Sequence, residues 1–479
     1  MNNKHDILIF LSDQHRGDFI HYAGNPVIRT PNLDRIAADG TVFTSAYSPC
    51  PLCVPARTSL LSGQLAMHTE VYTNHGAIRS DNATFLHSLG AEGYETVLCG
   101  RMHFEGPDQR HGFSKRIFGD LLQLYPGQED AYNELKYYRP TISENGCSKI
   151  YGGGDHSPTL DYDRLVINAA LDYLNEEHEK PQCIVVGVYA PHFPFVGPTD
   201  LYEYYLDILE KNDKKDPVFD YDLGILNPRQ QVYERSQVLR MRAAYYAMVE
   251  NLDMQIGKVK KAFDEYEKRR GASGIFIYTS DHGESLGDRN MYAKKTLFDN
   301  AARVPLVING DGIKKGQIVS SPVSIMDIGP TLCDMENCMK APDLDAYSLK
   351  DELENGNNPS RVVFSECMEK KGEQFVPGIM VRKGDYKLIW YYGHEDEMLL
   401  FNLKDDKKET HNLISVEPDI LEDLMSEAKR IWNPEHIIKI HENRLAHIQI
   451  LMKWGKSVHP VETERWHIPA SSLAMPEKV

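Results

Sequence analysis

Two short stretches of the sequence place candidate metal ligands directly after apolar, strand-like runs. The run ILIFLS near the start ends in Asp13 and Gln14, and the later run IFIYTS ends in Asp281 and His282. In open α/β sheets, ligands bind beyond the carboxyl ends of the strands. Two carboxylates, an amide oxygen and an imidazole can together hold a divalent cation. Either aspartate alone could be a strand-end cap, but as a pair they predict a metal site.

A cysteine motif supplies the second candidate centre. Cys53 opens the pentapeptide CVPAR, which ends in Arg57. Pro55 suits the first turn of a helix, where its missing N–H leaves no partner unsatisfied. The N-terminus of such a helix would face an anion, and Arg57, about one turn along, would bring further donors. An isolated cysteine is most often a buried structural thiol, so the prediction of chemistry rests on the motifs around it.

Together these motifs resemble the sulfatase family, whose signature is C-x-P-x-R followed by a helix and a Leu-x-x-Gly stretch. CVPAR continues here as TSLLSG, and the segments TPNLD at 30–34, DHGE at 281–284 and RVP at 303–305 also look like the family, in the expected order. The resemblance implies an alkaline-phosphatase-like fold, with Cys53 oxidised to formylglycine by a maturation enzyme. A hydrated aldehyde offers one hydroxyl that can displace the alcohol from sulfur and a second whose deprotonation can expel sulfate.

The metal ligands differ from those of many sulfatases in a way that narrows the resemblance. Many members have a third aspartate where Gln14 stands and an asparagine where His282 stands. The Gln/His pair found here looks like choline sulfatases and phosphonate monoester hydrolases. With one carboxylate fewer, the site is less anionic. Calcium, magnesium and manganese all stay candidates for the single divalent cation, with calcium favoured.

The resemblance also implies which residues handle the substrate. Arg101 and His103 stand where the family shows G-K-x-H, whose lysine binds sulfate and whose histidine contacts formylglycine. Arginine can also bind an oxyanion, in a bidentate manner. His192, in the segment PHFP, and Lys294 correspond to residues that contact sulfate and the leaving-group oxygen, so either could donate a proton to the alkoxide. Asn74 resembles a polar pocket residue of the phosphonate hydrolase branch.

Three functions compete on this sequence. The first is hydrolysis of sulfate monoesters of a carbohydrate or a small organic alcohol, releasing the alcohol and inorganic sulfate. The second is hydrolysis of phosphonate monoesters or phosphodiesters at the same site, because these esters carry the same single negative charge. The third is a non-catalytic anion-binding protein with an unmodified Cys53 and no metal, and the intact ligand set argues against it. A choline ester would need an aromatic cage or a carboxylate for its quaternary ammonium, and a sugar would need polar and charged pocket walls; the sequence locates neither.

The elements that must position these residues follow an α/β pattern. Short apolar runs suit a mostly parallel sheet covered on both faces, so we expect a three-layer sandwich around a mixed sheet. The expected strands are Ile7–Ser12, Thr96–Cys99, Cys183–Tyr189, Ile275–Ser280 and Val304–Ile308. The main expected helices are Asn32–Asp39, Arg164–Glu177 and Gln237–Arg269.

Near residue 350 the sequence becomes polar and rich in turn-forming residues. We therefore expect a catalytic domain at 1–350 and a smaller α+β subdomain at 351–479. Turn signals there separate short runs that read as an antiparallel sheet. Those runs are Val362–Ser365, Gly378–Arg382, Tyr386–Tyr392 and Met398–Leu403. A helix is expected over Glu417–Trp432, and Trp466–Val479 reads as a tail.

Composition restricts the partners. The chain has 479 residues and a formal net charge of −17, which disfavours nucleic acids and anionic membranes as partners. No apolar stretch approaches the roughly 20 residues that span a bilayer, and the N-terminus lacks the shape of a signal peptide, so we expect a cytoplasmic protein. The expected partners are a sulfated substrate and the maturation enzyme, with a homo-oligomer left open.

Among the eight cysteines, Cys50 and Cys53 form a lone CxxC without a second pair, so a zinc ribbon is not expected. Most of the other cysteines should be reduced core thiols.

Overall fold

The computed structural model describes residues 4–106, 108–120, 150–213 and 216–458. Its largest element is an eight-stranded sheet in the order β12-β2-β11-β9-β1-β7-β4-β5. The strands are β1 (Asp6–Asp13), β2 (Gly40–Phe43), β4 (Glu95–Gly100), β5 (Lys115–Phe118), β7 (Gln182–Pro191), β9 (Gly274–Ser280), β11 (Leu306–Gly310) and β12 (Gln317–Val319). Strand β11 runs antiparallel to both of its neighbours, and the other neighbouring pairs of this sheet are parallel. The predicted mixed, mostly parallel sheet is confirmed.

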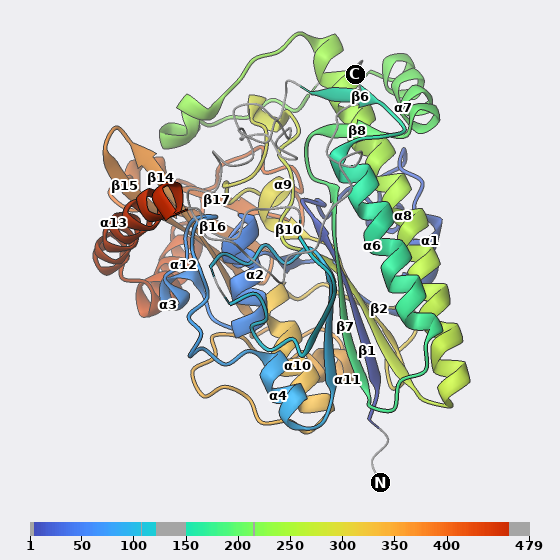
Figure 1. Ribbon diagram of the computed structural model, residues 1–479. Coiled ribbons are helices and arrows are strands. Elements are labelled where there is room, and N and C mark those ends of the chain that lie inside the picture. The colour runs from blue at the N-terminus through green and yellow to red at the C-terminus, as the bar shows by residue number, and fades with distance from the viewer. Residues whose placement is uncertain (1–3, 107, 121–149, 214–215, 459–479) are drawn as a thin grey trace.

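Helices cover both faces of this sheet, as Figure 1 shows. Side chains alternate along a strand, so Leu8 and Phe10 of β1 face one core while Ile7, Ile9 and Leu11 face the other. The first face packs against α1 (Pro31–Ala38), α6 (Pro158–Asn175) and the long α8 (Arg235–Arg270). The second packs against α2 (Cys53–Ser62), α4 (Phe85–Ala91) and α10 (Ile328–Met335). The three-layer sandwich is therefore also confirmed.

Most predicted elements of this sandwich agree with the structure to within two residues at each end, and two differ more. Helix α6 begins at Pro158, six residues before the predicted start, because the hydroxyl of Ser157 accepts a hydrogen bond from Leu160 N and caps the first turn. The run Val304–Ile308, predicted as one strand, is divided at Pro305. Proline has no N–H to continue a ladder. The chain therefore forms a short strand β10 (Arg303–Val304) before it enters β11.

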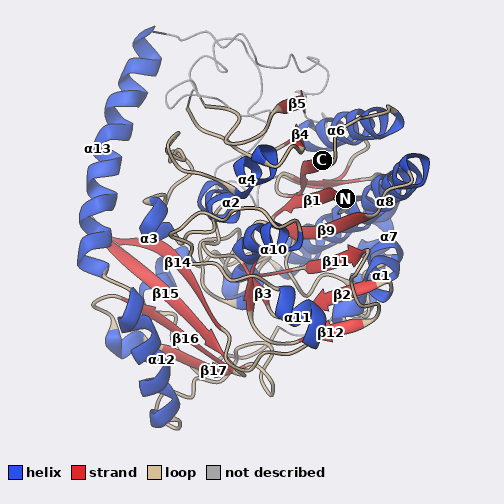
Figure 2. Cartoon of the chain, turned by 90° about the horizontal axis from the view of Figure 1, so that it is seen from below, coloured by secondary structure: helices blue, strands red, loops and turns tan. Residues whose placement is uncertain are grey.

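A second, antiparallel sheet lies beside the sandwich (Figure 2). It consists of β14 (Val362–Lys371), β15 (Gln374–Lys383), β16 (Tyr386–Tyr391) and β17 (Leu399–Asn402). One face packs against α12 (Pro418–Ile431) and α13 (Pro434–Val458), and the other covers the apolar segment around Leu297 and Phe298. The four strands and α12 agree with the sequence, whereas α13 was not predicted. The boundary at residue 350 stays a prediction, and the tail Trp466–Val479 lies outside the described residues.

The remaining described elements are short connections around these layers. They are β3 (Ala46–Tyr47), which pairs with β10 on one side and with β13 (Val323–Ser324) on the other, the parallel pair β6 (Tyr151–Gly153) and β8 (Phe195–Gly197), and the helices α3 (Ala66–Thr69), α7 (Thr199–Lys211), α9 (Asp299–Ala302) and α11 (Lys350–Asn355). Among the described residues, no helix is both long and apolar enough to span a membrane. Seven cysteines are described, all buried and free, as expected for core thiols, and Cys147 lies outside the described residues.

Candidate active site

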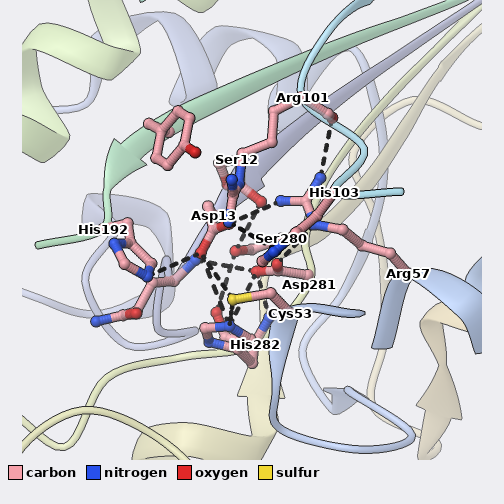
Figure 3. Close-up of polar contacts among 12 residues, drawn as sticks. Ser12, Asp13, Cys53, Arg57, Arg101, His103, His192, Ser280, Asp281 and His282 are labelled. Carbon is pink, nitrogen blue, oxygen red and sulfur yellow. Dashed lines mark hydrogen bonds and ion pairs between the residues drawn. The ribbon is translucent and has the colours of Figure 1, made fainter. Parts of the chain in front are cut away.

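The two strand ends singled out in the sequence meet at the carboxyl edge of the large sheet. Strands β1 and β9 are parallel neighbours with Ser12 opposite Ser280, so Asp13 and Asp281 leave the sheet side by side. Helix α2 begins at Cys53 against the same edge. The ligand atoms of Asp13, Cys53, Asp281 and His282 all lie within 4.8 Å of one another (Figure 3). The structure thus brings together four residues that lie up to 269 positions apart in the chain.

The cysteine sulfur lies inside this cluster. Cys53 Sγ is 3.3 Å from His282 Nε2 and 3.8 Å from Asp13 Oδ1. Burial and the Asp13 carboxylate raise the pKa of the Cys53 thiol, but Lys294 and His282 outweigh them, so the pKa is lower than that of an ordinary cysteine. A buried structural thiol would instead show a raised pKa, as Cys99 and Cys183 do. The environment of Cys53 therefore suits a reactive or metal-facing side chain.

Gln14 is oriented by the residues around its amide. Its backbone adopts a left-handed φ of 72°, and its Nε2 donates to the carboxylate of Glu284. A carboxylate can only accept, so the amide oxygen must point the other way, where it accepts from the Lys294 ammonium. The other oxygen of Glu284 accepts from the backbone N–H of Leu286 and Ala293, at 2.8 and 2.6 Å. Gln14 thus presents an oxygen, not a nitrogen, to the site.

Arg57 clamps the two carboxylates. Its Nε lies 2.9 Å from Asp281 Oδ2, its Nη2 lies 3.0 Å from Asp13 Oδ2, and its Nη1 donates to the backbone oxygen of Arg101 at 3.0 Å. All three guanidinium nitrogens are engaged in a site where Arg57 is 1 % exposed. Burial disfavours an ionised Asp13, yet the charges of Arg101 and Arg57 hold the pKa of Asp13 well below its usual value. Asp13 is therefore kept charged, and Arg57 holds both carboxylates in position.

The donor set fits a divalent cation. The second oxygen of each carboxylate, Asp13 Oδ1 and Asp281 Oδ1, lies 3.7 and 3.6 Å from His282 Nε2. The ring orientation of His282 is set by Nδ1, which donates to the Gly283 carbonyl at 3.0 Å, so Nε2 is left to ligate. Two carboxylate oxygens and one imidazole nitrogen lie together there, and with the oxygen of Gln14 as the predicted fourth ligand they would make an oxygen-rich set that suits calcium, magnesium or manganese.

His192 and Lys294 contact each other next to Asp13. Lys294 Nζ lies 2.7 Å from His192 Nε2, and His192 Nδ1 lies 2.6 Å from the Phe193 carbonyl oxygen. A carbonyl oxygen accepts only, so His192 carries its proton on Nδ1 and its Nε2 accepts from Lys294. Burial and the Lys294 charge lower the pKa of His192 well below its usual value. Lys294 is 2 % exposed, so this contact lies in the interior of the site.

Asn74 and Arg101 have structural tasks at the site. Asn74 Oδ1 accepts from Val54 N at 3.1 Å and so caps the first turn of α2, where Leu52 offers no side-chain cap. Arg101 is fully buried, and its Nε lies 2.6 Å from Asp13 Oδ2. Both were predicted to bind substrate, and that role stays a prediction beside these contacts.

Comparisons with known proteins agree with this geometry. The sequence model of the family described as Sulfatase matches residues 5–336, more than half of the chain. The chain belongs to the sulfatase family. A second model, described as N-sulphoglucosamine sulphohydrolase, C-terminal, matches residues 287–431. The resemblance read from the motifs is confirmed.

Curated relatives support the choline-sulfatase branch. This sulfatase is 30% identical over 434 residues to a choline-sulfatase of Rhizobium meliloti (strain 1021), covering 86% of this chain and 82% of the relative. It is 28% identical over 447 residues to an arylsulfatase of Clostridium perfringens (strain 13 / Type A), covering 86% of this chain and 91% of the relative. The chain is therefore a sulfuric ester hydrolase.

Solved structures support the fold. A phosphonate monoester hydrolase of Agrobacterium radiobacter superposes with a TM-score of 0.69 at 20% identity, covering 94% of this sulfatase and 96% of that chain. A protein solved with its substrate D-glucosamine-2-N,6-O-disulfate superposes with a TM-score of 0.71 at 20% identity, covering 89% and 97%. At this identity the likeness shows a common fold alone, which is the alkaline-phosphatase-like fold expected from the motifs.

Proposed function

We propose that this sulfatase hydrolyses sulfate monoesters with a formylglycine hydrate derived from Cys53 and one divalent cation. We expect this cation to be calcium. The observation that carries the proposal is the convergence of Cys53 with Asp13, Asp281 and His282 within 4.8 Å. Asp13, Gln14, Asp281 and His282 would hold the cation. Once bound, it would neutralise anionic charge and lower the pKa of a coordinated hydroxyl.

The protein's own residues would bind the anion and supply the proton. The Lys294 ammonium, next to His192 Nε2, is a charged donor for a sulfate oxygen or for the departing alkoxide. His192 cannot donate from Nε2 in the tautomer set by Phe193, so its part is to hold Lys294. Arg57 keeps the carboxylates aligned.

The substrate class is part of the proposal. We expect a sulfated carbohydrate or a small organic sulfate, in line with relatives that are a choline-sulfatase and an arylsulfatase and with a neighbour solved with a disulfated glucosamine. Phosphonate monoesters are the second candidate, because two solved neighbours are phosphonate monoester hydrolases. A cytoplasmic location and a dedicated maturation enzyme also belong to this proposal.

Mass spectrometry of the Cys53 peptide tests the chemistry. When the protein is produced with a formylglycine-generating enzyme, the peptide should become about 18 Da lighter in its aldehyde form, and activity should follow the converted fraction. Chelation should abolish turnover, and calcium should restore it. Cys53→Ala, a matched variant that cannot be converted, should be inactive towards aryl sulfates and aryl phosphonate esters alike. Full activity with an unaltered thiol mass would contradict the proposal, and activity confined to phosphonate esters would favour the second candidate.

A further inference from the structure

The guanidinium of Arg101 is held between four groups. Its Nε lies 2.6 Å from Asp13 Oδ2 and its Nη2 lies 3.0 Å from His103 Nδ1. The plane stacks on the ring of Tyr189, with the guanidinium carbon 3.9 Å from the ring centroid. Nη1 faces the Asp120 carboxylate at 3.6 Å. Figure 3 shows Arg101 reaching from Asp13 to His103.

This contact fixes the protonation pattern of His103. Arginine has N–H donors and no acceptor, so Nη2 donates and His103 Nδ1 must accept. The ring of a neutral histidine carries one proton, and here it must be on Nε2. His103 is therefore the opposite tautomer to His192, whose proton is on Nδ1. Burial and the charges of Arg101 and Arg57 lower the pKa of His103 well below its usual value, which is consistent with a neutral ring.

Asp120 ties Arg101 and His103 together. Its Oδ2 accepts from the backbone N–H of His103 at 3.0 Å, and its Oδ1 accepts from the Tyr189 hydroxyl at 3.3 Å. His103 has a left-handed φ of 57°. A residue that is not glycine keeps such a conformation only where its surroundings hold it. The Asp120 carboxylate thus supports the backbone of His103 with one oxygen and meets the tyrosine hydroxyl and the guanidinium with the other.

We propose that Asp120 and Tyr189 are positioning residues that hold Arg101 so that His103 presents an Nε2–H donor to the substrate. The proposal rests on the proposed function for its catalytic meaning, because His103 is taken to face the reacting group. His103 acts as a hydrogen-bond donor to an oxygen there, and it does not act as a base. Arg101 acts through His103 and Asp13, as a positioning residue.

A lysine at position 101 would not reproduce this arrangement. The planar guanidinium offers separate donors in a fixed fork, whereas a lysine offers one ammonium on a flexible stem. Arg101 donates to Asp13 from one nitrogen and to His103 Nδ1 from another, and its plane stacks on Tyr189. A lysine has a single nitrogen and no planar group, so it cannot make all three contacts in this geometry. The guanidinium of Arg101 therefore depends on two further groups to fix its orientation. They are the ring of Tyr189, on which it stacks, and the carboxylate of Asp120, which faces Nη1.

Nuclear magnetic resonance of histidine-labelled protein tests the tautomer directly. Long-range proton–nitrogen spectra separate protonated from unprotonated ring nitrogens, and His103→Gln identifies the signals of His103. In the wild-type protein with an unconverted Cys53 we expect the proton on Nε2. Asp120→Asn turns an amide N–H₂ towards Tyr189 and Arg101, and Tyr189→Phe removes only the hydroxyl, so both should mix the tautomers. This measurement needs no turnover, so a wrong assignment for Cys53 would not affect its result.

Kinetics of the matured enzyme give the second readout. Asp120→Asn and Tyr189→Phe should each lower kcat by about 10- to 100-fold with little change in KM, since the hydrogen bond is needed in the transition state. Tyr162→Phe is the matched control. Tyr162 is fully buried, packs edge-on against Tyr189 and donates to the Gly119 carbonyl, yet it should leave the tautomer and kcat unchanged. A proton on Nδ1 of His103 in the wild type, or wild-type kcat in both variants, would overturn the proposal.

Discussion

The protonation state of single side chains decides how this site can act on an ester. Lys294 is a cation whose Nζ lies 2.7 Å from His192 Nε2, while His192 is held neutral and uses its own proton on the Phe193 carbonyl. Lys294 is thus the group with a proton to give. An alkoxide leaving group needs that proton, whereas an acidic phenol leaves without much help.

Lys294→Ala should therefore act selectively on leaving groups. We expect kcat/KM for alkyl sulfates to fall by about 100-fold or more, with a much smaller loss for 4-nitrophenyl sulfate. A series of sulfates with graded leaving-group pKa measures this as a steeper dependence in the variant. Lys295→Ala is the control, because it removes the adjacent lysine and keeps Lys294 Nζ against His192 Nε2. An equal loss for every ester would show that Lys294 binds sulfate without transferring the proton.

At the scale of elements, the strand β14 is joined to the catalytic part of the chain through Glu366. Its Oε1 accepts from the Tyr72 hydroxyl at 2.7 Å and its Oε2 accepts from Met67 N, in the short helix α3, at 3.0 Å. Burial raises the pKa of Glu366 from 4.5 to about 7. The folded state therefore favours the protonated acid more than the unfolded state does.

The sign of the resulting pH dependence follows from linkage. Because the folded pKa is the higher one, the contribution of Glu366 to stability is present at low pH and is lost as the pH rises from about 4.5 through about 7. In Glu366→Gln the free energy of unfolding should fall by up to about 3 kcal/mol less over this pH range. Urea titrations at a series of pH values would show this as a flatter curve of unfolding free energy against pH. The exposed Glu373→Gln should leave the curve unchanged. Parallel curves for wild type and Glu366→Gln would contradict the expectation.

The elements that the sequence predicted well are those with a strong local pattern. The strands β1 and β9 are continuous apolar runs, and their polar ends predicted Asp13, Asp281 and His282, which the structure places beside Cys53. Helix α13 has no comparable stripe, and its residues Ile450 and Trp454 are exposed, so local periodicity did not indicate it. Strand β14 continues through charged residues to Lys371 because β15 pairs with it along its whole length. The pattern of β14 alone does not show this pairing.

Contacts between strands explain what the sequence did not predict at the site. Arg101 follows β4, and Tyr189 lies on β7, its neighbour in the sheet. Their approach needs Gly187, where a Cβ atom would lie 1.9 Å from the Arg101 carbonyl oxygen. Asp120 and Glu284 act on residues that were predicted, through hydrogen bonds that depend on strand order. Glu284 stands in the DHGE segment, so the motif pointed to this residue. The motif did not show that its carboxylate binds the amide of Gln14.

At the scale of the whole molecule, the charge of the protein opposes the charge of its substrate. The formal net charge is −17, while a sulfate monoester is an anion. The buried cation Arg57 is balanced at the site by ion pairs with Asp13 and Asp281. At distances beyond the site, the summed field therefore repels an anionic ester, and this repulsion is screened over about 10 Å at 0.1 M salt.

Added sodium chloride should accordingly speed the enzyme at low ionic strength. We expect kcat/KM for an anionic aryl sulfate to rise by a factor of about two to five as the salt concentration goes from about 0.01 to 0.15 M, where the screening length falls from about 30 to about 8 Å. Choline sulfate is the matched control substrate, because its ammonium and sulfate cancel and the long-range field has little net charge to act on. Initial rates at substrate concentrations far below KM give both values directly. A fall for the anionic ester with a constant rate for the zwitterion would mean that chloride competes at the anion site, and that the acidic surface does not limit substrate entry.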